Sequence, residues 1–145
     1  MPKLTLLSLR GNVHFTGGIN WGSNKKNHTR KYDAYIPIHL KTIRANHPFF
    51  LPKTDPNPVL KFTWDDGTKM LGKFEGSAKN YLDGKRYPKQ ISSFPHKDLL
   101  GKYLRDRMGI YSSRRVTIED FNAYGRSDIE ITQIGPGEYL LNFSV

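Results

Sequence analysis

Cysteine is absent from this chain of 145 residues. Disulfide scaffolds, thiolate zinc sites and cysteine nucleophiles are therefore excluded. Long apolar runs are also missing, because none approaches the roughly 18 residues that a membrane-spanning helix needs. The first ten residues hold a brief apolar stretch with no cleavage-like site after it, so we expect no signal peptide. These absences predict a soluble, cytoplasmic protein with no membrane partner.

Acidic residues are few, and they are unevenly placed. There are 13 Asp and Glu against 23 Lys and Arg, which gives a formal net charge of +10. Between Val116 and Val145 five acids face a single base, Arg126, so this stretch carries −4 and residues 1–115 carry +14. A segregated excess of positive charge is typical of a surface that binds a polyanion. A solvated basic coat is the alternative interpretation.

Two basic, polar segments interrupt an otherwise strand-like chain, and we call them the first arm (17–31) and the second arm (77–90). Both mix long cations with amide and aromatic side chains, and neither has the periodicity of a buried element. Lys and Arg neutralise phosphates, whereas Asn, Gln, Arg and Lys also pair with base edges. Two flexible, solvated loops are the alternative, but loops this long in a compact domain are usually functional. We therefore expect two arms that grip DNA.

Side-chain chemistry ranks the candidate DNA contacts of this sequence. The candidates for base edges, which can pair with guanine or adenine, are Arg30, Arg86, Lys25, Lys85 and Gln90. The candidates for weaker base or sugar contact are Asn24, Asn27, Thr29, Lys79 and Asn80. The candidates for phosphate contact, which set register, are Lys26, Lys31, Lys89, Arg114, Arg115 and Arg126. The set is completed by Asn20, Trp21, His28, Tyr81 and Tyr87, of which Trp21 is the favoured anchor that packs the first arm onto the barrel.

Residue patterns predict about seven strands and two or three short helices. Strands are expected at 4–9, 34–38, 59–64, 69–74, 129–134 and 139–143, with 13–15 also extended and 89–92 leading out of the second arm. Helices are expected at 39–46, from Pro95 to Met108, and at 117–124 with Thr117 as the cap and Asp120 three residues on. The proline-rich stretch 48–58 reads as a covering loop, and Asp66-Gly67 as a hairpin turn. The fold class predicted is mainly β: a seven-stranded open barrel capped by short helices, with residues 1–145 as one domain.

A metal-dependent nuclease is one alternative function. Asp65, Asp66, Glu75 and Lys79 superficially match the carboxylate-plus-lysine set that holds Mg²⁺ in many nucleases. However, the two Asp residues sit in a predicted hairpin turn, where Asp is expected for backbone reasons. The five histidines fit no metal-ligand spacing. We expect no metal site and no cofactor.

A second nuclease pattern fails on one residue. His39-Leu40-Lys41 resembles the start of the His-x-Lys-x4-Asp motif of phospholipase-D-type nucleases, but Asn46 stands where the motif needs Asp. We therefore expect a chain with no catalysis of its own.

Several short motifs, in order, resemble the DNA-recognition domain of type II restriction endonucleases of the NgoFVII kind. They lie within Gly17–Ser144 and comprise Ile19–Gly22, Asp33–Ile38, Phe49-Phe50-x-Pro52, Asp65–Gly67, Leu99–Ile110, Thr117-x-x-Asp120-Phe121 and Tyr124–Arg126. The resemblance implies a pseudobarrel like the B3 DNA-binding domain of plant transcription factors, also seen in the effector domain of EcoRII-like enzymes. In that fold two arms enter the major groove. In the NgoFVII kind a phospholipase-D-like cleavage domain precedes this one, and the present chain has no room for it.

The predicted function is sequence-specific binding of double-stranded DNA, as the target-recognition domain of a bacterial or archaeal restriction endonuclease. A nuclease domain or subunit is a further candidate partner, and the nucleoid is the expected location. One rival is a single-stranded DNA or RNA module, in which Trp21, Tyr81 and Tyr87 stack on bases. The other rival is the metal-dependent nuclease, using Asp66, Glu75 and Lys79.

Overall fold

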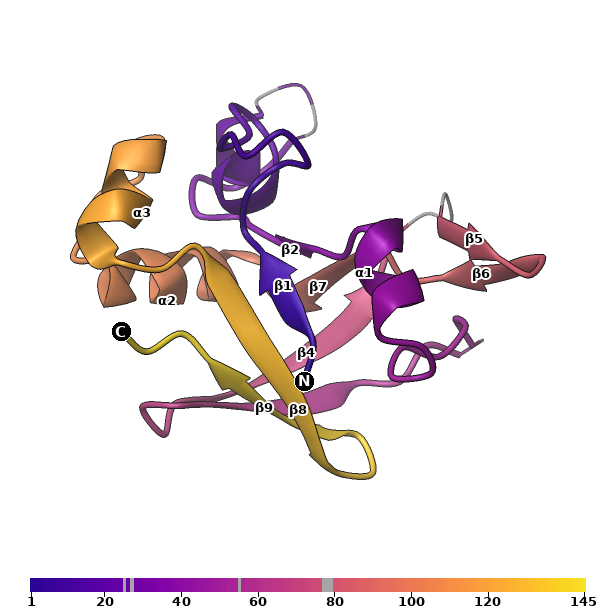
Figure 1. Cartoon of the computed structure of the whole chain (residues 1–145). Coiled ribbons are helices and arrows are strands. Elements are labelled where there is room, and N and C mark those ends of the chain that lie inside the picture. Colours follow the sequence, from indigo (N-terminus) through magenta and orange to yellow (C-terminus); the bar gives the residue numbers. More distant parts are fainter. Residues whose placement is uncertain (25, 27, 55, 77–79) are drawn as a thin grey trace.

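A computed structural model describes residues 1–24, 26, 28–54, 56–76 and 80–145, with the backbone alone at Asn80 and Tyr81. Within these residues one sheet has seven strands, in the order β1 (Lys3–Thr5), β8 (Asp128–Gly135), β9 (Glu138–Asn142), β3 (Leu60–Trp64), β4 (Lys69–Glu75), β7 (Gln90–Ser93) and β2 (Ile36–Pro37). The edge strands β1 and β2 come into contact, so the sheet curls into a nearly closed barrel (Figure 1). The predicted mainly β barrel with short helices is confirmed.

Buried and exposed side chains alternate along the strands, and the buried ones fill the barrel. In β3, Leu60, Phe62 and Trp64 are buried and Lys61 between them is exposed, which is the period of two that a half-buried strand requires. A Cβ at Gly72 on the neighbouring β4 would lie 2.1 Å from the ring of Phe62. Glycine at this position therefore makes room for the ring inside the barrel. Pairing between neighbouring strands is antiparallel except between β3 and β9, which run parallel.

Three α-helices accompany the sheet in the described residues: α1 (Leu40–Ala45), α2 (Asp98–Arg107) and α3 (Ile118–Tyr124). Helix α2 begins three residues after the predicted start at Pro95, because the Ser93 hydroxyl donates to His96 O and accepts from Leu100 N, which holds residues 94–97 in a bend. Helix α3 begins after Thr117, whose backbone N–H donates to the Asp120 carboxylate as predicted. None of the described helices is long and apolar enough to cross a membrane.

Two further sequence predictions need correction. Residues 6–9 and 13–15 are not strands, because the chain folds into a turn in which Ser8 N donates to Asn12 O and Gly11 N donates to Ser8 O. The second arm, which was expected to lack regular structure, contains a hairpin of β5 (Asn80–Leu82) and β6 (Lys85–Tyr87).

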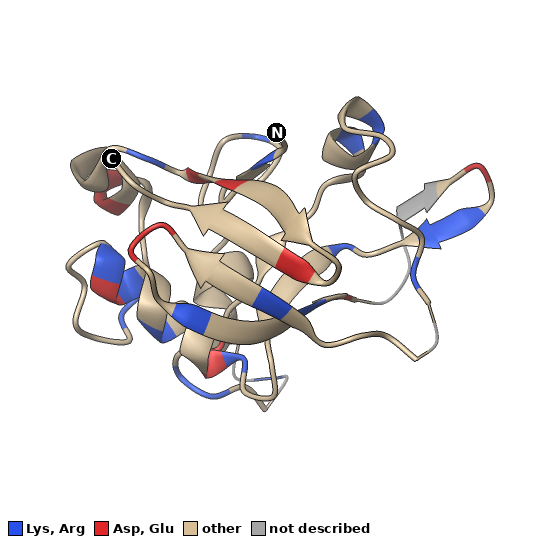
Figure 2. Cartoon of the chain, turned by 90° about the horizontal axis from the view of Figure 1, so that it is seen from below, with Lys and Arg blue, Asp and Glu red and all other residues tan. Residues whose placement is uncertain are grey.

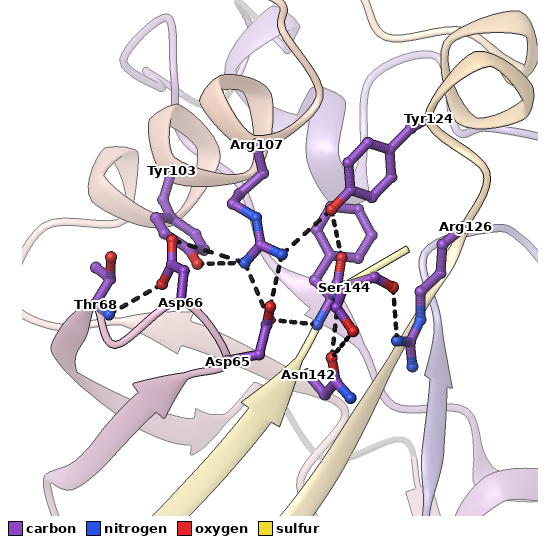
Figure 3. A network of polar contacts seen from close by, with 10 residues as sticks. Asp65, Asp66, Thr68, Tyr103, Arg107, Tyr124, Arg126, Asn142 and Ser144 are labelled. Carbon is purple, nitrogen blue, oxygen red and sulfur yellow. Dashed lines mark hydrogen bonds and ion pairs between the residues drawn. The ribbon is translucent and has the colours of Figure 1, made fainter.

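A polar network around Arg107 closes one end of the barrel (Figure 3). The Arg107 guanidinium donates to both Asp65 carboxylate oxygens, at 3.0 and 2.8 Å, and to the hydroxyls of Tyr103 and Tyr124. Asp65 also accepts from Phe143 N at 2.8 Å. The network thus joins the end of α2, the end of α3, the β3–β4 turn and the last residues of the chain. These contacts make Asp65 a structural residue.

Candidate nucleic-acid interface

The two arms lead into neighbouring strands of the barrel, β2 and β7. The first arm leads into β2, and the second arm connects β4 to β7. Strands β7 and β2 pair antiparallel, with Ile91 opposite Ile36 and Gln90 opposite Pro37. The first arm therefore joins the Ile36 end of β2, and the second arm joins β7 beside the Pro37 end. In Figure 1 the first arm lies at the top of the view, and the β5–β6 hairpin extends to the right.

The base of the first arm is a 3-10 helix, η1 (Gly18–Ser23), that is fastened by a buried amide. The Asn20 side chain is 1% exposed. Its Nδ2 donates to His14 O and Val116 O, and its Oδ1 accepts from Val116 N at 2.8 Å. The prediction that Asn20 contacts DNA is therefore corrected, because its polar atoms are already bonded inside the protein.

Arg105, in α2, reinforces this fastening. The side chain is 1% exposed. Its guanidinium donates to Ile19 O at 3.1 Å and to Arg114 O at 3.3 Å, and it lies 5.7 Å from the centre of the Tyr32 ring. Burial lowers the pKa of the guanidinium. Helical periodicity could not locate this residue, because a buried arginine is rare.

The first arm closes on itself above this base. Gly22 N donates to Asp33 O at 2.8 Å, and a Cβ at Gly22 would lie 2.5 Å from Arg30 O. Thr29 donates its hydroxyl to Gly22 O and Asn24 O, so it is part of the closure. The two ends of the arm are thus held against each other.

Trp21 is an anchor, as favoured from the sequence. Its ring meets the Tyr35 ring edge-on at 5.7 Å between centroids, and Lys97 Nζ lies 5.3 Å from its centre. The described first-arm cations that face solvent are Lys26, His28 (when protonated), Arg30 and Lys31. Lys25 and Asn27 lie outside the described residues.

The hairpin of the second arm has two distinct faces. Its turn is Asp83-Gly84, and both residues have positive φ, 53° and 73°, as a tight two-residue hairpin turn requires. Tyr87 is 3% exposed within the core, and Leu82 packs against the same core. Because side chains alternate along a strand, Arg86 faces away from the barrel, where it is exposed. Lys85 is exposed near the turn.

The proline-rich loop supports the hairpin. Lys53 N donates to Arg86 O at 2.8 Å, and Lys53 Nζ donates to Gly76 O at 2.6 Å. At the junction with β7, Gln90 is 8% exposed and donates to the Ser92 hydroxyl. Tyr87 is therefore corrected as a DNA contact, because its side chain is buried in the core. Gln90 is largely buried but lines the depression described below, so its role stays a prediction. Lys89 is half-buried over Gly76, and Lys79 lies outside the described residues.

A depression of about 350 Å³ lies between the points where the two arms attach. Its lining includes Tyr35 on the side of the first arm and Lys89 on the side of the second arm. Leu9, Pro37, His39 and Lys41 also line it. The two arms thus flank a concave surface that carries cations.

This fold agrees with what comparison with known families finds. The family model of the NgoFVII C-terminal B3-like DNA-binding domain matches residues 2–135. The chain belongs to this family of B3-like DNA-binding domains. Among curated proteins, no sequence matches the chain.

Three arginines outside the arms of this B3-like domain are candidate phosphate contacts. They differ in whether their charge is already paired within the protein. Arg126 is held by Asp128 at 2.9 Å and Glu130 at 3.2 Å, so its charge is neutralised within the protein and it is corrected as a phosphate contact. Arg114 pairs with Asp120 at 2.8 Å. Arg115 stacks over the exposed Phe15 ring, with its guanidinium carbon 3.6 Å from the ring centre. Arg115 therefore remains the strongest of the three candidates.

The carboxylates considered for a nuclease site are engaged elsewhere. Asp65 is bound by Arg107, and Glu75 pairs with Lys97 at 2.7 Å. Asp66 caps the β3–β4 turn through Thr68 N. Among the described residues of this B3-like domain, no three His, Asp or Glu side chains gather as a metal site would require.

Proposed function

We propose that this B3-like domain binds double-stranded DNA sequence-specifically, with its two arms in the major groove, as the target-recognition part of a restriction endonuclease. The observation that carries the proposal is the placement of the two basic arms: the first leads into the Ile36 end of β2, the second leads into β7 beside the Pro37 end of β2, and a concave surface lies between them. A duplex lying across β2 then meets one arm on each side.

The shape of the second arm suits the major groove. That groove is about 12 Å wide and admits a two-stranded ribbon, and β5–β6 is such a ribbon. Its outward Arg86 and its turn-proximal Lys85 are the side chains that approach base edges first. Arg86 is the leading candidate for a bidentate contact with guanine.

The first arm contributes a compact loop. Its closure at Gly22, Thr29 and Asp33 limits the conformational freedom that binding has to remove. Arg30 reads a base edge in this proposal, and Lys26 and Lys31 neutralise phosphates. The roles proposed from the sequence are kept for four further residues: Lys25, Asn27, Lys79 and Asn80.

Duplex binding fits the aromatic residues better than single-strand binding does. A single-strand module uses exposed aromatic faces on which bases stack. Trp21 is packed against Tyr35, and Tyr87 is buried in the core. Two of the three candidate stacking residues are therefore already used in folding.

The domain acts in this proposal without catalysis of its own, as one recognition unit spanning residues 1–145. Cleavage then belongs to a separate nuclease domain or subunit. The engagement of Asp65 with Arg107 and of Glu75 with Lys97 supports this division, because carboxylates already paired with cations are poor metal ligands.

Selection of bound duplexes from a random pool tests the proposal. We expect a consensus site to emerge, and we expect an excess of unlabelled consensus duplex to displace bound probe while either single strand does not. Equal enrichment of all sequences, or stronger competition by single strands, would contradict the proposal. Plasmid and Mg²⁺ incubated with the same protein should yield no cleavage.

A further inference from the structure

A hydrogen-bonded turn, Ser8–Asn12, borders the depression between the arms, and no predicted DNA contact includes it. Its backbone is closed by Ser8 N donating to Asn12 O at 2.7 Å and by Gly11 N donating to Ser8 O at 2.9 Å. The Ser8 hydroxyl also accepts from Asn12 N at 3.2 Å. Gly11 supplies the positive φ, 80°, that this turn needs. Leu9 and Arg10 are displayed at its tip.

The turn is fixed to the barrel on its N-terminal side. Leu6 is 1% exposed, and Leu7 packs against the hydrophobic core. Leu7 O lies 3.2 Å from His39 Nε2, which ties the turn to the residue before α1. A side chain at the tip therefore has a defined position relative to β2.

Leu9 is apolar, exposed and placed where DNA is proposed to lie. It is 72% exposed, yet it lines the depression between the arms together with Lys41 and Lys89. An isolated exposed leucine is ordinary on a protein surface. With the duplex placed between the arms as proposed, a leucine at this position would face the floor of the groove. The apolar feature of that floor is the C5-methyl group of a pyrimidine.

We propose that the Ser8–Asn12 turn is a third DNA-contacting element, in which Leu9 recognises the C5-methyl group of one pyrimidine and Arg10 neutralises a neighbouring phosphate. Thymine and 5-methylcytosine both present this methyl group in the major groove. The inference rests on the proposed function, since it needs the duplex between the arms.

The test begins with the duplex that the wild-type protein selects from a random pool. Each thymine is then replaced by uracil, which lacks the methyl group, and each cytosine by 5-methylcytosine. For the wild type we expect one position to respond by about fourfold in Kd, the factor for burying one methyl group. A loss at a uracil identifies thymine as the source, and a gain at a methylated cytosine identifies 5-methylcytosine.

The response at that position should disappear in Leu9→Ala and persist in Leu9→Met, which keeps the apolar contact. Ile134→Ala is the matched control, because Ile134 is also exposed, at 58%, but lies near the β8–β9 turn. Arg10→Ala should weaken all duplexes alike and reduce the slope of log Kd against log salt by about 0.9. An unchanged thermal midpoint in each variant confirms folding.

Two failures are distinguishable. If the wild type selects no consensus, the proposed function fails and the inference falls with it. If a consensus emerges but Leu9→Ala keeps the same affinity and the same response to every methyl group, the third contact is refuted and the two-arm proposal stands.

Discussion

Arg86 and Tyr87 are neighbours in β6, yet they face opposite ways. Tyr87 is buried in the core, and Arg86 is exposed on the outer face of the hairpin. The same division separates Arg105, which fastens the first arm from inside, from Arg30, which faces solvent. At the scale of single residues, a side chain that points into the core has a structural role, and one that points to solvent is available for contact with DNA.

Arg86→Ala should weaken binding to the selected site by about 1–3 kcal/mol and relax specificity at one base pair, because a bidentate contact to guanine is lost. Lys69→Ala, an exposed cation of β4, is the control and should bind as the wild type does. Binding is measured by fluorescence anisotropy on the site and on its single-base variants. Equal weakening across all sequences would instead make Arg86 a phosphate contact.

Residue roles were the part that composition predicted least well. The arms stood out because cations and amides cluster there, but composition does not say which polar side chain turns inward. Asn20 and Gln90 look like base readers in the sequence, and both are buried. Leu9, the proposed third contact, carries no polar group, so the clustering of cations and amides does not point to it.

Each arm is a distinct structural element, and the second arm owes its form to its turn. Asp83-Gly84 is a dipeptide that favours a tight hairpin, and this pattern in the sequence could have predicted β5–β6. The signal is weak, because the flanking strands are only three residues long each. The β3–β4 hairpin, with its Asp66-Gly67 turn and alternating strands, was recognised.

Gly84→Ala and Gly67→Ala form a matched pair at these two turns. Both glycines have positive φ, 73° and 87°, and a Cβ at either would meet no atom within 4 Å. Each substitution should cost about 1 kcal/mol of local backbone strain. In Gly84→Ala we expect weaker DNA binding with only a small change in thermal midpoint, because β5 and β6 pair only with each other and the turn itself is exposed. In Gly67→Ala the midpoint should fall while DNA affinity is retained. If Gly84→Ala kept its DNA affinity and Gly67→Ala lost affinity, the hairpin would not be part of the DNA-binding surface.

Helix α3 begins with an ionisable cap, which makes its stability depend on pH. The hydrogen bond from Arg114 lowers the pKa of Asp120 to about 2, and bonds from Thr117 act in the same direction. Since the folded pKa lies below the unfolded value of about 3.9, the carboxylate stabilises the fold above pH 4. That contribution is lost as the pH falls through about 2.

Asp120→Asn should therefore lower the free energy of unfolding at pH 7 by about 1 kcal/mol, and the difference from wild type should vanish between pH 4 and pH 2. Urea denaturation at a series of pH values measures it. Glu119→Gln, the exposed neighbour in the same turn, is the control and should show no such dependence. A difference that stays constant down to pH 2 would contradict the role assigned to the Asp120 carboxylate.

Charge is unevenly distributed over the described residues. The acids of the C-terminal stretch lie on α3, β8 and β9, whereas β6 of the second arm is basic (Figure 2).

The fold class could be predicted from the sequence because strand alternation, glycine turns and helix caps are local signals. The motifs that resemble the NgoFVII family include Asp65, Arg107 and Tyr124, which build the network in Figure 3. The resemblance therefore lies partly in residues that hold the fold together.

A domain that binds through this separated charge should respond strongly to salt. If six phosphates are neutralised, log Kobs should fall with log salt at a slope of about −5. Anisotropy titrations between low and physiological salt measure the slope. Lys31→Ala should make the slope shallower by about 0.9, since one phosphate contact is lost. Affinity that is independent of salt would contradict a phosphate-contacting surface.

The central claim, that two arms hold one duplex through its major groove, is tested most directly by dimethyl sulfate protection on the selected site. The wild type should protect guanine N7, which lies in the major groove, in two separate clusters. Arg30→Ala should lose protection in one cluster, and Arg86→Ala in the other. Protection confined to adenine N3 in the minor groove, or loss of the same cluster in both variants, would contradict the account.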